Sequence, residues 1–371
     1  MKADSVGLYV HIPFCKRKCN YCDFCSFPLR LEEEKKAYLA ALSNEIESYR
    51  GKSISVDTVF FGGGTPSLLS GDELSFILES LRSVFKIEDD AEITLEANPG
   101  TVNEQTLRAY RSSGVNRLSF GLQSIHKNEL KLLGRIHSFE DFKLSYEGAR
   151  LAGFTNINVD IMYGIPEQTA SSFIKTINEI VALSPEHISV YSLIIEEGTP
   201  LFENRDKLVF PPEDEECDMY YAAADLLSKK GYGHYEISNY SIPDFECKHN
   251  LKYWRDLEYI GLGLNAHSYF RGERFNNTAE MQKYICGNYL DNRSEVLPAD
   301  REFEFAMLAL RLKEGISNKI YRELFGKDFI LPRIEKLKQF SLHGLLIFDE
   351  ERVALTEKGF YVSNSILTEL L

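Results

Sequence analysis

Three cysteines near the start of the chain are the residues best suited to chemistry. Cys15, Cys19 and Cys22 follow the apolar stretch Val6–Val10 with the spacing C-x3-C-x2-C. A [4Fe–4S] cluster normally takes four cysteine thiolates. Three thiolates on one short loop would hold three irons and leave the fourth iron open to a small-molecule ligand. The spacing therefore predicts an iron–sulfur cluster with one open iron.

A structural zinc site is the alternative for the same cysteines, with Cys25 as a fourth thiolate. Structural zinc sites favour two paired elements that are separated in sequence, and no second pair follows here. We therefore favour the cluster and interpret Cys25 as a neighbour of the site that does not bind iron. The remaining cysteines, Cys217, Cys247 and Cys286, are scattered, which is typical of free thiols in a reducing compartment.

Composition limits the class of protein. The chain has 371 residues, of which 44% are hydrophobic, and its formal net charge is −14. This length allows a large core and more than one domain, and the acidic balance argues against nucleic acid as the main partner. We expect a cytoplasmic protein, because the first residues lack the layout of a signal peptide and no apolar run reaches the length of a membrane span. Peripheral attachment to a membrane and a homodimeric state are left open.

Six short β-rich runs alternate with helix-period segments up to about residue 195, which predicts an α/β fold with a parallel sheet. Every chemically suggestive residue falls at the C-terminal end of a run, where the active sites of barrels lie. We therefore expect a barrel in preference to a doubly wound sheet. The six runs are Leu8–Ile12, Val56–Phe61, Glu92–Ala97, Arg117–Phe120, Ile157–Ile161 and Ile188–Leu193.

Two helix boundaries are predicted in this first part of the chain. The segment Leu31–Arg50 has a helical period, and Gly51 is expected to cap its C-terminus. Ser70 is expected to cap the next helix, with Glu73 three residues later completing a capping box.

Further candidate site residues follow later strands. The run Gly62-Gly63-Gly64-Thr65-Pro66 would let the backbone approach a ligand without interference from Cβ atoms. Glu96 ends the third run, where a carboxylate would accept hydrogen bonds from both hydroxyls of a ribose. Gln123, Arg135 and Asp160 come after it. Taken singly, a tight turn explains the glycine run at least as well as a ligand does. A structural role explains each of the others better: a solvated acid for Glu96, a hydrogen-bonded amide for Gln123, a surface arginine for Arg135 and a capped strand for Asp160.

The cysteine spacing and the glycine run together resemble the radical S-adenosylmethionine (SAM) superfamily, whose open iron binds the amino acid end of SAM. From Tyr9 to at least Ser268, the motifs are similar to those of the oxygen-independent coproporphyrinogen III oxidase-like family. This resemblance implies a partial (β/α)6 barrel. It also implies that Tyr9, Gly63 and Glu96 contact one SAM. A second SAM would be contacted by Gly64, Thr65, Gln123, Arg135 and Asp160.

His249 lies in the segment H-N-L-K-Y-W, which holds the only tryptophan of the chain. Histidine is a common axial ligand of heme iron, and flanking aromatic rings would pack on the macrocycle. A core histidine among buried aromatics explains the same pattern, and Cys247 is a competing ligand. The segment resembles a motif of heme chaperones in the same family, whose histidine ligates heme iron. That resemblance implies heme as cargo and heme-receiving apoproteins, plausibly of the respiratory chain, as partners.

A radical SAM oxidoreductase that acts on a porphyrinogen is the alternative within the family. The oxidase carries a long extension before its cysteine motif, whereas Cys15 lies close to the first residue here, so we favour the heme chaperone and assign no catalytic residue. Covalent c-type attachment is not expected, because C-x-x-C-H is absent. A third hypothesis is a zinc-stabilised barrel without a redox role.

Three parts are expected along the chain. Residues 1–235 would form the core barrel with the cluster and SAM sites, and residues 236–300 would form a connecting segment with the heme motif. Residues 301–371, with a hairpin over Gly344–Leu355 and a final helix, resemble a winged-helix domain. This last part carries equal numbers of acidic and basic side chains, which favours a structural or lid role over DNA binding.

Overall fold

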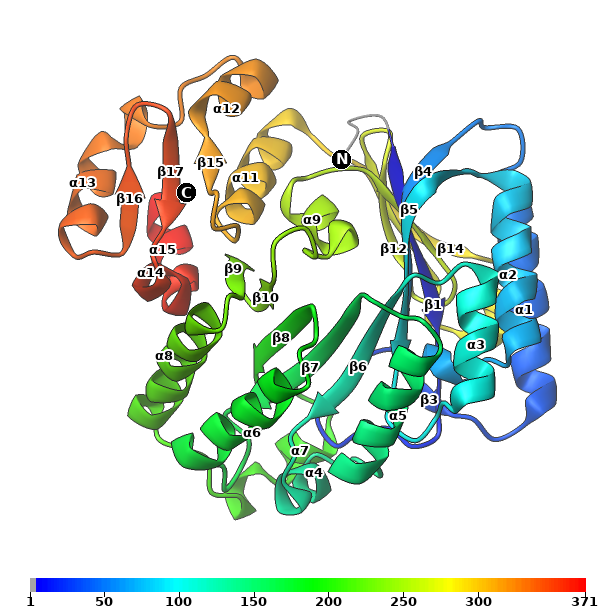
Figure 1. The fold of residues 1–371 in the computed structure, drawn as a ribbon. Helices are drawn as coiled ribbons and strands as arrows, with labels where there is room; N and C mark the ends of the chain where they lie inside the picture. The colour runs from blue at the N-terminus through cyan, green and yellow to red at the C-terminus, as the bar shows by residue number, and fades with distance from the viewer. Residues whose placement is uncertain (1–4) are drawn as a thin grey trace.

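The computed structural model describes residues 5–371, and a twelve-stranded sheet forms its centre (Figure 1). Six parallel neighbours lie in the middle of this sheet. The six predicted strands and their parallel arrangement are therefore confirmed. The strands are β1 (Val6–Ile12), β4 (Ser55–Gly63), β5 (Lys86–Ala97), β6 (Arg117–Gln123), β7 (Ile157–Tyr163) and β8 (His187–Ser192).

Shorter strands extend both edges of the parallel region. On one side, β11 (Tyr259–Leu262) pairs in parallel with β1, and three antiparallel strands follow: β12 (His267–Phe270), β13 (Glu273–Asn277) and β14 (Leu290–Glu295). On the other side, β10 (Asn239–Ser241) and β9 (Gly233–Glu236) pair antiparallel beyond β8. The two end strands, β14 and β9, do not pair, so the sheet is the expected partial barrel.

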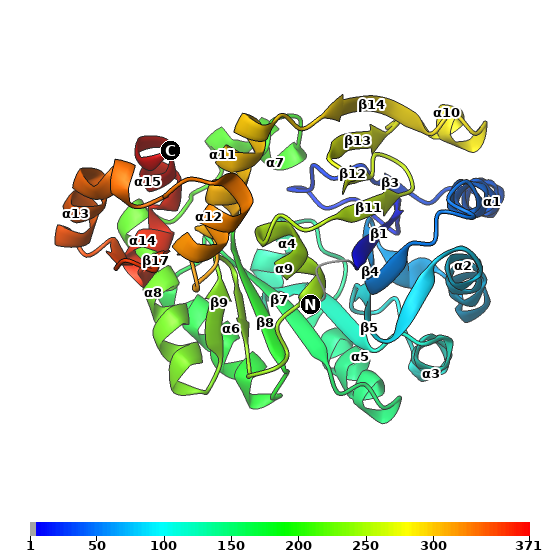
Figure 2. The same cartoon turned by 90° about the horizontal axis from the view of Figure 1, so that it is seen from above.

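Helices cover the outer face of the curved sheet (Figure 2). The predicted capping box of α2 is confirmed, because Glu73 N–H donates to Ser70 Oγ at 3.1 Å and Ser70 N–H donates to Glu73 Oε2 at 2.7 Å. The predicted cap at Gly51 is wrong. Helix α1 ends at Glu47 with Ser48 as its C-cap, and Gly51 (φ 84°) lies in the turn beyond. The outer helices are α1 (Glu32–Glu47), α2 (Gly71–Val84), α3 (Glu104–Ser113), α5 (Phe139–Leu151), α6 (Ala170–Ala182) and α8 (Glu213–Lys229).

The two faces of the central strands differ in chemistry. Side chains alternate between faces along a strand, and the outward row is apolar and buried beneath the helices, as with Leu118 and Phe120 of β6. The inward row is largely polar or aromatic and surrounds a cavity. The hydrophobic core therefore lies between the sheet and the helices, whereas the barrel interior is a cavity lined by polar and aromatic side chains. Its inward residues include Tyr9, His11, Phe60, Glu96, Arg117, Ser119, Asn158, Asp160, Ser189 and Tyr191.

The C-terminal part forms a small helical unit with its own three-stranded sheet. The predicted hairpin is confirmed as β16 (Leu346–Phe348) and β17 (Arg352–Leu355), and β15 (Ile316–Ser317) pairs with β17. This arrangement agrees with the expected winged-helix-like unit. Within residues 5–371, no helix is long and apolar enough to cross a membrane. The helices of this unit are α11 (Pro298–Ala309), α12 (Asn318–Phe325), α13 (Ile334–Leu342), α14 (Glu357–Tyr361) and α15 (Ser363–Leu370).

Replacing Leu118 by Ala should destabilise the barrel strongly. Leu118 is fully buried on β6 and lies between Leu95 of β5 and Ile157 of β7. Truncating a buried leucine usually lowers the free energy of unfolding by about 2–5 kcal/mol. Denaturant unfolding measures this loss. The control is Leu144→Ala, which changes a side chain that is 69% exposed and should cost less than about 0.5 kcal/mol. Equal losses in the two variants would contradict this account of the core.

Candidate functional site

The cysteine loop is anchored to the C-terminal edge of the barrel. Its base is the parallel pair β2 (Phe14–Cys15) and β3 (Phe27–Pro28). Asn20 fixes its middle, because its backbone N–H donates to Leu133 O at 2.9 Å and its side chain donates to Leu132 O at 2.9 Å. The N–H of Leu201 then donates to Asn20 O at 2.8 Å. These bonds place the three cysteines over the open end of the barrel.

Cys15, Cys19 and Cys22 line one cavity of about 350 Å³, whereas Cys25 lines a second cavity of about 510 Å³. His11 Nε2 bonds to the backbone oxygen of Cys25 at 2.8 Å and holds this end of the loop. Burial raises the pKa of the Cys15 and Cys22 thiols. The separation of Cys25 from the other three is consistent with its predicted role as a neighbour, which stays a prediction.

The arrangement of Cys15, Cys19 and Cys22 suits an iron–sulfur cluster better than a single metal ion. Among the residues that the structure describes, no three His, Cys, Asp or Glu side chains converge to hold one metal ion. In a cluster each thiolate binds a different iron, so the three sulfurs need not converge. All three thiols are free and face the same cavity. The donor set therefore fits a [4Fe–4S] cluster with one open iron.

Most of the predicted SAM residues surround the cysteine cavity. Tyr9 is the exception and lines the second cavity, which shares Gly63, Glu96 and Asp160 with the first. His249 lines neither cavity. The predicted residues that line the cysteine cavity are Gly63, Gly64, Thr65, Glu96, Gln123, Arg135 and Asp160.

The glycines Gly63 and Gly64 allow the end of β4 to pack closely against β1 and the residues that follow it. Gly63 has a φ of 107°, and a Cβ there would overlap the imidazole of His11. A Cβ at Gly64 would lie 2.7 Å from Phe14 O. The N–H of Gly64 donates to Ile12 O, and that of Thr65 donates to Phe14 O, both at 2.8 Å. These two amides are therefore bonded within the protein and are not free for a ligand, although Gly63, Gly64 and Thr65 all line the cavity.

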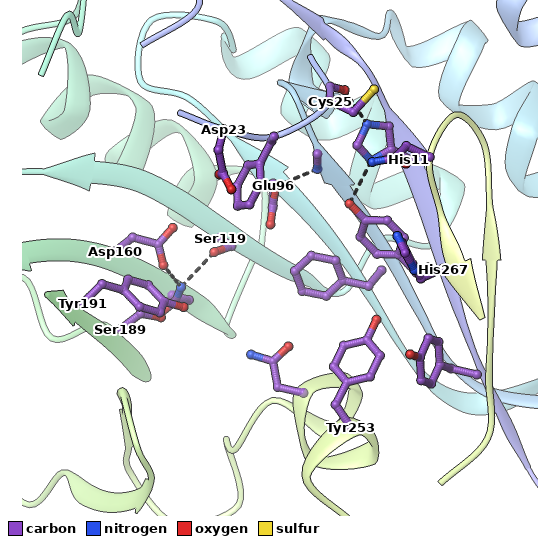
Figure 3. A pocket seen from close by; sticks show the side chains of 18 of the residues that line it. His11, Asp23, Cys25, Glu96, Ser119, Asp160, Ser189, Tyr191, Tyr253 and His267 are labelled. Atoms are coloured by element: carbon purple, nitrogen blue, oxygen red, sulfur yellow. Dashed lines mark hydrogen bonds between the residues drawn. The ribbon is translucent and has the colours of Figure 1, made fainter. Parts of the chain in front are cut away.

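Two carboxyl groups face the shared space between the cavities (Figure 3). Burial, followed by the nearby charge of Asp160, raises the pKa of Glu96 to about 8. Glu96 Oε2 accepts a hydrogen bond from Gly63 N–H at 3.3 Å. Burial also raises the pKa of Asp160, which accepts from Asn158 Nδ2 at 2.7 Å. At neutral pH Glu96 is largely protonated, so it can both donate to and accept from a sugar hydroxyl.

Arg135 connects the cysteine loop to the strand ends. Its Nη1 donates to Cys19 Sγ at 3.4 Å and its Nη2 donates to Asn98 Oδ1 at 2.9 Å. Asn98 Nδ2 in turn donates to Thr65 Oγ1 at 2.8 Å. Arg135 Nε and Gln123 Oε1 are buried without a partner among residues 5–371. Gln123 also has a positive φ of 70°. Unpaired buried polar atoms beside a cavity are typical of a site built for a ligand.

His249 is closed to ligands in this conformation. It lies on α9 (Lys248–Trp254), it is 1% exposed, and its ring stacks on Phe60. Nδ1 bonds to Thr58 Oγ1 at 2.9 Å and Nε2 bonds to Tyr253 OH at 2.8 Å. Heme ligation by His249 stays a prediction, and it requires the imidazole to lose one of these two bonds. Cys247, the competing ligand, is fully buried.

Two known families match separate parts of the chain. Residues 9–180 match the radical SAM superfamily, and residues 296–362 match the HemN C-terminal domain. The heme chaperone HemW of Lactococcus lactis is 35% identical and aligns over 98% of this chain and 96% of its own length. HemW of Escherichia coli is 36% identical and aligns over 99% of this chain and 98% of its own length. The chain belongs to the HemW family.

A solved structure extends the comparison to the fold. The coproporphyrinogen III oxidase HemN of Escherichia coli, a radical SAM enzyme, matches with a TM-score of 0.86 at 26% identity. The match covers 99% of this chain and 90% of HemN. This chain therefore shares with HemN both the partial barrel and the helical C-terminal unit, as the cysteine motif and the order of elements predicted.

Several residues that line these cavities are absent from the sequence-based set, and Asn98 and Arg117 are two of them. Asn98 lies two positions after Glu96 and shares its inward face, and Arg117 shares an inward face with Ser119. The period of two along each strand was the signal for both residues. This period identifies such residues only when it is known which face of each strand points into the barrel.

His249→Gln should make the protein less sensitive to acid. Burial lowers the pKa of His249 to about 3, so the imidazole is neutral when folded and takes up a proton on unfolding. Its contribution to stability is lost as pH falls from about 6.5 towards the folded value. Between pH 6.5 and 4.5 the free energy of unfolding should fall less steeply in the variant, by up to about 1.4 kcal/mol per pH unit.

Denaturant unfolding at a series of pH values measures the two slopes. His343→Gln, at an exposed position, is the control for the substitution itself. Equal slopes for the wild type and His249→Gln would contradict a buried, neutral imidazole.

Proposed function

We propose that this protein is a heme chaperone, which binds heme on a scaffold that holds a [4Fe–4S] cluster and SAM and passes the heme to apoproteins. The near-full-length similarity to heme chaperones HemW, at 35% and 36% identity, is the observation that carries the proposal. The predicted cluster residues and all of the predicted SAM residues except Tyr9 line one cavity, which supports it. Respiratory-chain apoproteins are the proposed acceptors, on the basis of the sequence resemblance.

In this proposal Cys15, Cys19 and Cys22 each bind one iron, and Cys25 binds none. The bound cluster supplies an electron and an open iron for the amino acid end of SAM. Tyr9, Gly63 and Glu96 hold this SAM, with Glu96 directed at the ribose. A second SAM is proposed to contact Gly64, Thr65, Gln123, Arg135 and Asp160. The unpaired atoms Gln123 Oε1 and Arg135 Nε support a polar ligand there.

His249 is the proposed axial ligand of heme iron. Its Nε2 bonds to the hydroxyl of Tyr253, and the Tyr253 side chain lines the 510 Å³ cavity. Movement of this one tyrosine would therefore open Nε2 towards the cavity. The proposed three-part division of the chain places this helix in the segment 236–300, between the barrel (1–235) and the C-terminal unit (301–371).

The second candidate function is a coproporphyrinogen III dehydrogenase. The TM-score of 0.86 with HemN favours it, because the barrel and the C-terminal unit are shared with that enzyme. The identity of 26% to HemN is lower than the 35% and 36% to the heme chaperones, so the chaperone is the better supported function.

Serine substitution of a cluster cysteine should remove most of the bound iron and sulfide. Each of Cys15, Cys19 and Cys22 is assigned to a different iron, so the loss of one thiolate leaves the cluster with only two protein ligands. Iron and sulfide analysis of protein purified without oxygen measures the effect. Cys25→Ser is the matched control and should keep the cluster. An equal loss of iron in Cys25→Ser would indicate a four-thiolate site instead.

The wild-type protein should bind heme and transfer it to an apocytochrome without producing protoporphyrinogen. The test incubates the cluster-loaded protein with SAM, a low-potential reductant and either heme plus apocytochrome or coproporphyrinogen III. Absorbance of the cytochrome reports transfer, and chromatography of the porphyrins reports decarboxylation. HemN of Escherichia coli is the positive control for the second reaction. Turnover of coproporphyrinogen by this protein would contradict the chaperone assignment.

A further inference from the structure

Arg117 places an unpaired positive charge at the wall of the barrel cavity. It begins β6, is 2% exposed, and faces the 510 Å³ cavity together with Ser119 and Asn158. Among residues 5–371, its side chain donates no hydrogen bond and has no carboxylate oxygen within 4.0 Å, and its Nε is buried without a partner. A buried charge without hydrogen bonds is costly. Such an arginine is therefore typical of a site that receives an anion.

Two carboxylates whose charges act on Arg117, those of Glu92 and Asp160, accept hydrogen bonds from other groups. Glu92, whose charge acts on Arg117, accepts hydrogen bonds from the backbone N–H groups of Lys248 at 3.1 Å and His249 at 3.2 Å. It thereby holds the first turn of α9. Asp160 accepts from Asn158 Nδ2 at 2.7 Å. Neither carboxylate forms an ion pair with Arg117 among residues 5–371, so this guanidinium can still pair with a ligand.

The remaining walls of this cavity suit a flat, conjugated ligand. Tyr191, Tyr253 and Glu96 point into the same space from different sides (Figure 3). Aromatic walls favour planar ligands, while a few fixed polar groups orient them. Asp23, Glu96 and Asp160 also line the cavity, but burial raises the pKa of Glu96 to about 8 and also that of Asp160, which reduces their negative charge. The aromatic wall residues are Tyr9, Phe24, Phe60, Tyr191, Tyr253 and Tyr259.

We propose that heme occupies this cavity and that Arg117 binds one of its propionate carboxylates. The inference rests on the proposed function, since heme is the flat ligand with carboxylates that this function supplies. A guanidinium pairs with a carboxylate through two parallel N–H···O bonds, which gives both affinity and orientation. The carboxylate of SAM has the same chemistry and is the competing source of the anion.

Affinities for hemin and for hemin dimethyl ester, which lacks free carboxylates, test this assignment. The wild type should bind the ester about ten- to a hundredfold more weakly than hemin, as expected for loss of a charged hydrogen bond. Arg117→Met should lower the hemin affinity by a similar factor and should not weaken ester binding further. Absorbance titration of the purified protein gives all four dissociation constants.

Two controls accompany the variant. Arg150→Met removes a half-buried arginine that pairs with Glu186 at 2.9 Å outside the cavity, and it should leave the hemin affinity unchanged. SAM affinity, measured by equilibrium dialysis, should be unchanged in Arg117→Met. Loss of SAM affinity with unchanged hemin affinity would overturn the inference and assign Arg117 to the SAM carboxylate.

The outcomes separate this inference from the function on which it rests. A wild type that binds no hemin would overturn the heme chaperone assignment itself. A wild type that binds hemin and its ester equally well would overturn only the role of Arg117. This comparison needs no variant, so it can refute the inference even if Arg117→Met fails to fold.

Discussion

The alternation of apolar and polar side chains along six parallel strands is the constraint on which this structure depends. The outward row must be covered by helices, because apolar side chains such as Leu118 and Phe120 are stabilised only when removed from water. The inward row cannot pack in the same way, since it carries Glu96, Arg117 and Asp160. Buried charged side chains need hydrogen-bond partners or a ligand, and the open barrel leaves space for a ligand.

The cysteine loop and the strand ends form one connected polar network. Asn20 fixes the loop to the turn after α4 (Lys127–Leu132), and His11 fixes its end through the backbone of Cys25. Arg135 then links Cys19 to Asn98. A ligand in this cavity would therefore meet groups whose positions are already set by the protein, which lowers the entropy cost of binding.

Helix α9, which carries the proposed heme ligand His249, is held against strands β4 and β5 by hydrogen bonds. Glu92 of β5 bonds to its first backbone amides, and Thr58 of β4 bonds to the imidazole of His249. The same helix contributes Tyr253 to the cavity wall. The side chains proposed to hold the nucleotide and those proposed to meet heme thus border one continuous interior, so occupancy of one site can affect the other through shared residues such as Glu96.

Local signals in the sequence were sufficient to predict the six parallel strands, the start of α2 and the cysteine loop, but not the end of α1. The six strands follow from β-rich runs, the start of α2 from Ser70 and Glu73, and the candidate cluster from the spacing of Cys15, Cys19 and Cys22. Each of these depends on residues that are close in sequence, so hydrogen-bond geometry and chain length limit the outcome.

Only the tertiary structure decided which side chains are free to meet a ligand. The sequence shows His249 beside aromatic residues, but not that Thr58 and Tyr253 occupy both of its ring nitrogens. It likewise gives Arg117 as the first residue of a strand, and only the packed barrel leaves this guanidinium unpaired. Thr58 lies 191 residues from His249 along the chain. Hydrogen-bond partners this distant are set by how the strands close around one another, which no local pattern encodes.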